Sequence, residues 1–342
     1  VSSIKEMEGY LSKGGVVRMK VPEGRKIVVN DLIRDKVEFD TSLLDDQVIL
    51  KSDGFPTYHL AVVIDDHDME ITHVIRGDEW LSSTPKHVLL HEYFNWQPPQ
   101  YVHLPVILGP DKKKLSKRHG ATSALGYKEM GYLPEAIVNF MALLGWNPKD
   151  NREEFTLKQL EAEFKIENVN KAPAVFDVEK LNNINEHYIK DQISKIKNKE
   201  EGTTALGDFG LENVTIGELE LIGRGGYKTL REAAEYVSKL RETPEYETQL
   251  LIFRKSDKER TLKGLQTANR QLQTIENWEN DQIQNILEEV VKDNRLSNGD
   301  VFWPVRVALS GEEKSPSPVE LAMALGKDES LKRIENAIEK LK

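Results

Sequence analysis

A short basic segment at residues 114–118 (Lys-Leu-Ser-Lys-Arg) contains the side chains whose chemistry is easiest to interpret. It places a serine hydroxyl between two lysine ammonium groups, and all three can donate hydrogen bonds to phosphate oxygens. An apolar run at residues 102–108, typical of a buried strand, precedes it. Ligands of open α/β sheets bind beyond the C-terminal ends of the strands. The segment is therefore interpreted as a phosphate-binding loop, whereas an arbitrary lysine-rich run would be a solvated loop.

Two other segments carry groups that can bind a carboxylate. Tyr58 follows a turn rich in Gly and Pro within residues 51–61, and Arg76 ends an apolar strand within residues 72–81. A tyrosine hydroxyl and an arginine guanidinium together supply the donors that a carboxylate ligand needs. Each segment also has a structural alternative. The turn can simply lead into a core helix, and the arginine can cap a strand end at the surface.

A parallel sheet would bring these segments together. The order strand, helix, strand, helix, strand between residues 48 and 108 predicts an α/β unit with parallel strands. After Thr122 the pattern becomes helical, with Pro134 at the first position of a helix that Gly145 ends. We therefore expect an α/β part followed by an all-α part. Strands are predicted at residues 16–21, 26–29, 48–51, 71–76 and 102–108, and an amphipathic helix from Asp78 or Glu79 to about Phe94.

The composition limits the classes of function. A length of 342 residues suggests two or three domains, and the sequence has no run of about 18 apolar residues that could span a membrane. The absence of cysteine excludes disulfides and thiolate zinc sites and suits a reducing cytoplasm. The net charge of -10 argues against non-specific binding of nucleic acids. A specific RNA site stays open, because residues 109–120 carry five Lys and Arg residues against one Asp.

Together, these segments resemble those of the bacterial-type glutamate–tRNA ligases, a family of class I aminoacyl-tRNA synthetases. Residues 114–118 with the following His-Gly-Ala resemble the KMSKS loop of that family, and residues 51–61 resemble its amino-acid pocket. Residues 131–146 and 305–311 resemble a stem-contact helix and anticodon-binding helices. The resemblance extends from about residue 16 to the C-terminus. It implies a partial Rossmann-like catalytic domain followed by helical domains.

The resemblance also implies a reaction. L-glutamate would be activated by ATP to glutamyl-adenylate and then transferred to the 3′ end of tRNA(Glu) in translation. Mg²⁺ would arrive with ATP and be held mainly by its phosphates. No zinc is expected, since His59, His73 and His119 lack the spacing of a metal site. We expect a cytoplasmic monomer without a membrane partner. The implied roles are glutamate binding for Tyr58 and Arg76, ATP binding for Glu79, Lys114, Leu115, Ser116 and Lys117, and catalysis for Lys114 and Lys117.

The same resemblance divides the chain into four ranges. An arginine that precedes a Thr-Leu helix start reads the anticodon in the bacterial group, and Arg224, ahead of Thr229, is the nearest match. A solvated loop arginine is the alternative for Arg224. The ranges are the end of an acceptor-stem-binding insertion (1–48), the second half of the Rossmann-like catalytic domain (49–124), a helical stem-contact region (125–190) and a helical anticodon-binding domain (191–342).

The sequence departs from the family pattern in one respect, because no His-x-Gly-His occurs in it. Class I synthetases use those histidines, at a helix start, to stabilise charge on the α-phosphate. We therefore expect that the chain lacks the first half of its catalytic domain and cannot charge tRNA alone.

Two other functions are alternatives to the ligase. One is a non-catalytic tRNA-binding remnant of the same family, which would have no use for the retained ATP and glutamate residues. The other is a glutaminyl relative, which would carry β-barrels where residues 190–342 predict helices. The retained Tyr58, Arg76, Glu79 and Lys117 therefore favour the ligase over the remnant, and the predicted helices favour it over the glutaminyl relative.

Overall fold

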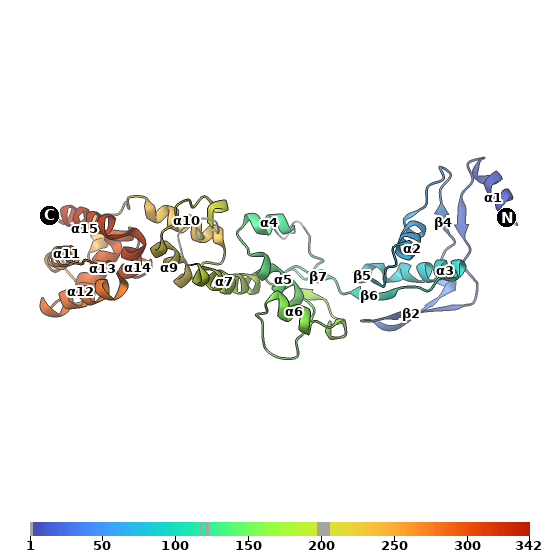
Figure 1. The fold of residues 1–342 in the computed structure, drawn as a ribbon, viewed down its shortest axis with the longest axis horizontal. Helices are drawn as coiled ribbons and strands as arrows, with labels where there is room; N and C mark the ends of the chain where they lie inside the picture. Colours follow the sequence, from blue (N-terminus) through green and yellow to red (C-terminus); the bar gives the residue numbers. More distant parts are fainter. Residues whose placement is uncertain (1–2, 117, 119, 121–122, 197–205) are drawn as a thin grey trace. The chain divides into compact units, whose positions relative to one another are not determined.

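The structure of the chain, a computed structural model, describes residues 3–116, 118, 120, 123–196 and 206–342 (Figure 1). It divides into two compact units. Unit 1 comprises Val1–Gly120 and Val138–Asp177, and unit 2 comprises Ala121–Ile137 and Val178–Lys342. Each unit is therefore built from two separate stretches of the chain. In the described ranges, no helix is long and apolar enough to cross a membrane.

Unit 1 is built around a four-stranded sheet in the order β3-β2-β6-β5. Strand β6 (Gln100–Leu104) lies between β2 (Lys26–Asp31) and β5 (His73–Gly77) and is parallel to both, which confirms a parallel α/β sheet. The strand predicted at residues 48–51 does not join it: β4 (Gln47–Leu50) pairs antiparallel with β1 (Val17–Met19) in a separate two-stranded sheet. Side chains of β2 alternate between exposed and buried, as expected for a strand with one covered face. Strand β3 (Asp35–Asp40) was not predicted, because its charged sequence is that of an exposed edge strand.

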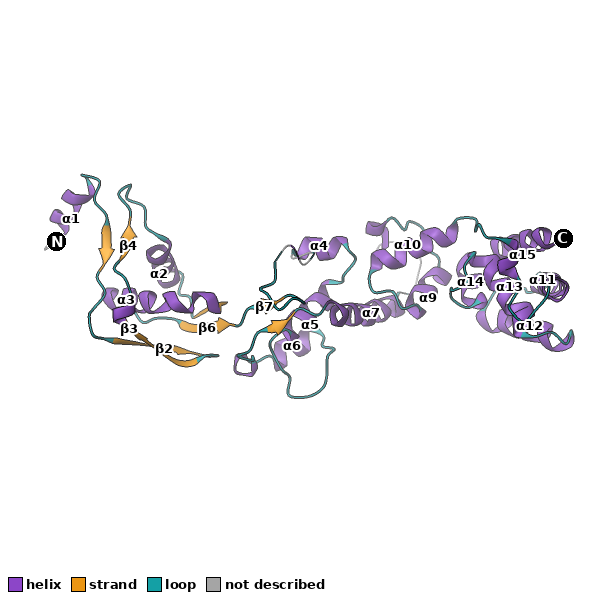
Figure 2. Ribbon diagram, turned by 180° about the vertical axis from the view of Figure 1, so that it is seen from behind, coloured by secondary structure: helices purple, strands orange, loops and turns teal. Residues whose placement is uncertain are grey.

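Two helices cover one face of this sheet (Figure 2). Helix α2 (Tyr58–Asp68) and helix α3 (Thr84–Phe94) contribute Val63, Leu89 and Leu90 to an apolar cluster that includes Ile27 of β2. Burying each such side chain stabilises the fold by roughly 1.5–3 kcal/mol. The remaining short elements of unit 1 are α1 (Ile4–Leu11), β1 (Val17–Met19), β4 (Gln47–Leu50), β7 (Ile107–Leu108), α6 (Leu157–Glu163) and β8 (Ala174–Val175).

Prolines account for two differences from the predicted elements. The helix predicted from Asp78 begins as a 3₁₀ helix (Asp78–Ser83) and becomes α-helical only at Thr84, because Pro85 has no N–H for an earlier α-helical turn. The strand predicted at residues 102–108 is split into β6 and β7, since Pro105 cannot join the hydrogen-bond ladder. The predicted end at Phe94 is confirmed.

The sheet contains strands from both sides of residue 48. The two compact units of the structure therefore have other boundaries than the four ranges expected from the sequence. Strands β2 and β3 lie before that residue and pair, directly or through β2, with β6. The four ranges describe functional divisions and remain predictions.

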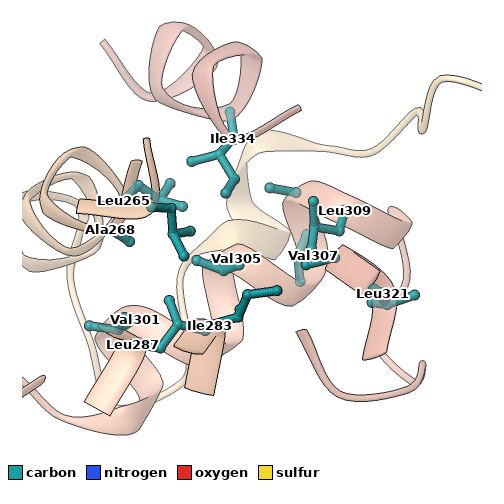
Figure 3. Packing of buried hydrophobic residues seen from close by; sticks show 14 of the residues in the cluster. Leu265, Ala268, Ile283, Leu287, Val301, Val305, Val307, Leu309, Leu321 and Ile334 are labelled. Carbon is teal, nitrogen blue, oxygen red and sulfur yellow. The ribbon is translucent and has the colours of Figure 1, made fainter. Parts of the chain in front are cut away.

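The regular elements of unit 2 within its described residues are all helices, which confirms the predicted change from α/β to all-α. Its largest core is an apolar cluster, part of which Figure 3 shows, and seven α-helices contribute buried residues to it. Leu265, Ile283, Val305, Leu321 and Ile334 each come from a different helix of this cluster and are almost fully buried. The helices of unit 2 are α4 (Ala124–Glu129), the first part of α5 (Pro134–Leu143), α7 (Val178–Lys195), α9 (Ile216–Arg224), α10 (Leu230–Arg241), α11 (Lys258–Leu272), α12 (Asn280–Asp293), α13 (Asn298–Ser310), α14 (Pro318–Leu325) and α15 (Lys327–Leu341).

A buried asparagine ties the start of α5 to the start of α10. The Asn185 side chain accepts a hydrogen bond from the Leu133 amide at 2.8 Å and donates one to the Lys228 carbonyl at 2.6 Å. Gly131 completes this contact, since its carbonyl accepts from the Leu230 amide at 2.9 Å. A Cβ on Gly131 would lie 2.8 Å from that amide nitrogen, and φ is +87° there, so only glycine fits. We call Gly131, Leu133, Asn185, Lys228 and Leu230 the Asn185 clamp.

Candidate active site

The site begins where two parallel strands end. Arg76 of β5 and His103 of β6 are register partners, so their side chains lie on the same face of the sheet. The Arg76 Nε–H donates to His103 Nε2 at 3.1 Å. This position at the C-terminal ends of the strands is the one that the sequence predicted for Arg76.

Asp31 at the end of β2 holds His103 from the other side. Its Oδ2 lies 2.6 Å from His103 Nδ1 and 3.0 Å from the His103 main-chain nitrogen. Its Oδ1 accepts from the amides of Ile33 and Arg34, at 2.9 and 2.8 Å. Both Asp31 and His103 are buried, so this pairing satisfies groups that would otherwise be costly to bury.

The remaining contacts of the Arg76 guanidinium are also with neutral groups. One terminal nitrogen donates to the buried Thr84 hydroxyl at 2.8 Å and lies 3.5 Å from the Trp80 carbonyl. The other terminal nitrogen lies 3.5 Å from His87 Nδ1, too far for a strong hydrogen bond. Among the described residues, no carboxylate lies within ion-pair distance of Arg76. The second terminal nitrogen is therefore the part of Arg76 that is best placed to bind a ligand.

Tyr58 lies on the same side of the site, at the first position of α2. Its ring is 5.3 Å from the Trp80 ring and 6.4 Å from the His87 ring. His87 in turn lies 2.8 Å from His59 Nδ1, and half of the Tyr58 side chain is exposed. The two residues predicted to bind glutamate, Tyr58 and Arg76, are thus brought together around His87.

The histidines of this site are neutral at physiological pH. Burial, helped by the Arg76 charge, lowers the pKa of His87 to about 3. Burial also lowers the pKa of His103 and of His59, although Asp31 opposes the shift at His103. The guanidinium of Arg76 is therefore the positive charge of this cluster, and an anion bound there would interact with a single, fixed cation.

The predicted ATP side of the site is more exposed. Lys114 Nζ lies 2.6 Å from a carboxylate oxygen of Glu79, and this hydrogen bond lowers the Glu79 pKa. Lys114 stands on a short hairpin that starts at β7, in which the Leu115 amide donates to the Ile107 carbonyl at 2.8 Å. Because both charges are solvated, the pair stabilises the fold by at most about 1 kcal/mol. It can therefore be exchanged for other partners at little cost.

Gly77 supports the position of Glu79. A Cβ at residue 77 would lie 2.1 Å from the second carboxylate oxygen of Glu79, so the carboxylate folds back over the glycine. Any larger residue would have to displace it.

The other predicted site residues have mixed outcomes. Ser116 is exposed next to half-buried Leu115, and Lys117 lies outside the described residues. Arg224, for which a solvated loop arginine was the alternative, is instead the last residue of α9 and lies 3.9 Å from Glu220, one helical turn earlier. The helix reaches Arg224 because a capping box at Thr215 starts it firmly and Gly225 ends it. The ligand-binding roles of these residues remain predictions.

Sequence reasoning missed the buried residues that hold Arg76. Asp31, Thr84, His87 and His103 were not singled out, although His103 had a usable signal: it is a polar residue inside an apolar strand, Gln100–Leu104. A histidine there must find a partner when buried. Within the described part of the chain, no group of three or more His, Asp or Glu residues could hold a metal ion.

Comparison with known proteins identifies close relatives. Residues 3–183 match the family "tRNA synthetases class I (E and Q), catalytic domain", and residues 211–338 match "Anticodon binding domain". The glutamate–tRNA ligases of Alkaliphilus metalliredigens and Clostridioides difficile are 43% and 40% identical, over 95% and 97% of this chain and 68% and 69% of their own lengths. A crystal structure of a glutamate tRNA ligase from Elizabethkingia meningosepticum, in complex with its amino acid, is 34% identical and matches with a TM-score of 0.83. That match covers 99% of this chain and 72% of the other.

Proposed function

The chain belongs to the glutamate–tRNA ligase family, and we propose that Tyr58 and Arg76 bind L-glutamate while Glu79 and the basic hairpin bind ATP. The observation that carries this proposal is the set of groups that hold Arg76 in place. This arginine is fixed at the C-terminal ends of two parallel strands by neutral groups only, and its neighbour His87 also lies beside the ring of Tyr58. A guanidinium held in this way keeps its full charge for a carboxylate ligand.

In the proposed reaction, the α-carboxylate of glutamate attacks the α-phosphorus of ATP. The bond from that phosphorus to the bridging oxygen breaks, and pyrophosphate leaves with its magnesium. A 3′-terminal ribose hydroxyl of tRNA then attacks the glutamyl carbonyl, and AMP leaves. Such transfers depend mainly on positioning and on stabilising charge, which is the task proposed for Lys114 and Lys117.

The Glu79–Lys114 pair suggests how the hairpin responds to the nucleotide. In the structure, Glu79 holds the Lys114 ammonium group in place. Phosphate oxygens of MgATP would replace the carboxylate as partners of Lys114, at a cost limited by the exposure of the pair. Lys117, three positions further on, would then reach the leaving pyrophosphate.

Kinetics in an active ligase that contains this chain test these roles separately. Arg76→Lys keeps the charge but loses the forked hydrogen bonds, so we expect the KM for glutamate to rise about 10- to 100-fold. Lys117→Ala should lower the adenylation rate about 10²- to 10³-fold and leave glutamate binding nearly unchanged. Equal losses of both in Lys117→Ala would mean that this lysine is structural.

We also propose that the 342-residue polypeptide alone does not activate glutamate, because its sequence has no His-x-Gly-His. Glutamate-dependent exchange of pyrophosphate with ATP, assayed with tRNA(Glu) present, should be absent for this polypeptide. Exchange above background would refute this. A tRNA-binding remnant, in contrast, would bind tRNA, but Arg76→Lys would not change any glutamate-dependent activity, whether the chain is assayed alone or as part of a longer protein.

Unit 2 is proposed to bind the anticodon of tRNA(Glu), in line with its match to an anticodon-binding domain. Arg224 is exposed at the C-terminal end of α9, five residues before the cap of α10. Arg224→Ala should weaken binding of tRNA(Glu) and also weaken discrimination against altered anticodon bases. A loss of affinity that is the same for every anticodon would leave Arg224 as a general phosphate contact. We expect the protein to act in the cytoplasm as a monomer, as expected from the sequence.

A further inference from the structure

The arginine proposed to bind glutamate is held by a layer of buried neutral groups. His103 Nε2 and the Thr84 hydroxyl accept from Arg76 at 3.1 and 2.8 Å, and neither carries a charge that would compete with a ligand. Had a carboxylate taken the place of His103, the guanidinium would already be paired. An incoming anion would then gain little from it. The neutral state of His103 is therefore a requirement of the site.

Asp31 determines which ring nitrogen of His103 carries the proton. All four groups within hydrogen-bond distance of its two oxygens are N–H donors or can be: the amides of Ile33, Arg34 and His103, and His103 Nδ1. A carboxylate with three main-chain donors is ionised, because a protonated carboxyl would turn a donor toward another donor. His103 Nδ1 must then carry a proton and donate a hydrogen bond to Asp31.

This arrangement leaves Nε2 of His103 as a lone-pair acceptor. Its lone pair faces two donors, the Arg76 Nε–H and the Thr84 hydroxyl, each 3.1 Å away. The bond from Arg76 fixes the plane of the guanidinium and the direction of its free terminal nitrogen. In the opposite tautomer, an N–H of His103 would point at an N–H of Arg76, and the guanidinium would have to move. Asp31 thus acts on Arg76 through His103 without neutralising it.

We propose that Asp31 and His103 are positioning residues for substrate recognition: buried Asp31 fixes the tautomer of His103, whose Nε2 orients Arg76 toward the substrate carboxylate. This inference rests on the proposed role of Arg76 in glutamate binding. It adds two residues, both buried and neither in contact with substrate, to the determinants of glutamate affinity.

The first test measures the KM values of an active ligase that contains this chain. Asp31→Asn is nearly isosteric but removes the charge that fixes the His103 tautomer. We expect the KM for glutamate to rise about 10- to 100-fold and the KM for ATP to stay within about 2-fold of its original value. Asp40→Asn is the matched control, since Asp40 is exposed on the neighbouring β3 and caps a short helix, a role that asparagine also fulfils.

A double-variant cycle separates positioning from general structural damage. If Asp31 acts through Arg76, then adding Asp31→Asn to Arg76→Lys should raise the KM for glutamate little further. Full additivity, or equal increases in the KM values for glutamate and ATP, would overturn the proposal. So would an unchanged KM for glutamate in Asp31→Asn while Arg76→Lys raises it. If Arg76→Lys itself has no effect, the proposed function of Arg76 fails and the positioning role fails with it.

A spectroscopic test does not depend on activity. The 342-residue chain, labelled with ¹⁵N at its histidines, should show one buried imidazole as the Nδ1–H tautomer, assigned by its loss in His103→Gln. Asp31→Asn should shift that resonance toward the Nε2–H tautomer, and Asp40→Asn should leave it in place. An Nε2–H tautomer or an imidazolium at His103 in the unaltered chain would overturn the proposal.

Discussion

Replacing Asn185 with alanine should loosen one defined part of unit 2. The amide of Asn185 is fully buried and has the Leu133 N–H and the Lys228 carbonyl as partners, at 2.8 and 2.6 Å. Asn185→Ala leaves the buried Leu133 N–H and the partly buried Lys228 carbonyl without this partner, and each such group costs about 1–3 kcal/mol. We therefore expect the free energy of opening the Asn185 clamp to fall by about 2–6 kcal/mol.

Hydrogen exchange read by mass spectrometry can measure this locally. Peptides spanning residues 129–135 and 227–233 contain the amides of Leu133 and Leu230, which donate within the clamp. A loss of at least 2 kcal/mol corresponds to exchange at least about 30-fold faster in these peptides. Peptides from α11 to α15 belong to the largest apolar cluster, which includes none of the clamp residues, and should exchange as before.

The control lies on the same helix. Asn183 is exposed and, among the described residues, accepts only from the Lys228 ammonium group, at 3.0 Å, so Asn183→Ala should change stability by less than about 0.5 kcal/mol. Equal exchange rates in the two variants would refute the reasoning. An acceleration spread evenly over all helices of unit 2 would also refute it, since Asn185 would then support global stability and not a local clamp.

Three further outcomes are expected. Gly77→Ala should displace the Glu79 carboxylate, because one of its oxygens lies 2.1 Å from the new Cβ position. The KM for ATP should then rise several-fold, which corresponds to a loss of roughly 1 kcal/mol of binding free energy. An unchanged KM for ATP would exclude a role for that carboxylate. Burial opposes ionisation of Asp300, but hydrogen bonds from its arginine and serine partners outweigh it and hold its pKa well below the ordinary value. The folded state therefore binds this proton less tightly than the unfolded state, so the stabilisation from ionised Asp300 is complete above about pH 5 and is lost as the pH falls. The urea midpoint of unfolding should drop between pH 5 and pH 3, and it should drop less in the Asp300→Asn variant. Arg333→Met should lower the free energy of unfolding by about 3–5 kcal/mol, because the buried guanidinium binds carbonyls at the ends of two helices and a glutamate; a loss below 1 kcal/mol would contradict this.

Local sequence patterns predicted much of the fold. The strands at residues 26–29 and 71–76, the helix start at Pro134 and the change to helices all follow from periodicity and capping, and the structure contains them. The pattern failed where a proline overrode it, as at Pro85 and Pro105, and where a strand lies exposed at the sheet edge. Those failures concern hydrogen-bond ladders, which apolar periodicity does not report.

The site was predicted only as far as its residues stand in recognisable segments. Tyr58 and Arg76 stand in such segments, and the structure brings them to one place. Asp31 and His103 are separated by 72 positions and meet only because β2 and β6 are neighbours in the sheet. Strand order and register fix that contact, and neither can be read from a single sequence.

The two-stretch construction of unit 2 has a consequence for its synthesis. At roughly 5–20 residues per second, the ribosome makes Leu230 several seconds after Gly131. During that delay the nascent segment before α5 has no α10 to bind, although the part of unit 1 that follows it has already emerged. Co-translational folding of the all-α part must therefore wait for Lys228 and Leu230. A polypeptide truncated before them should present an unprotected segment to proteases and chaperones.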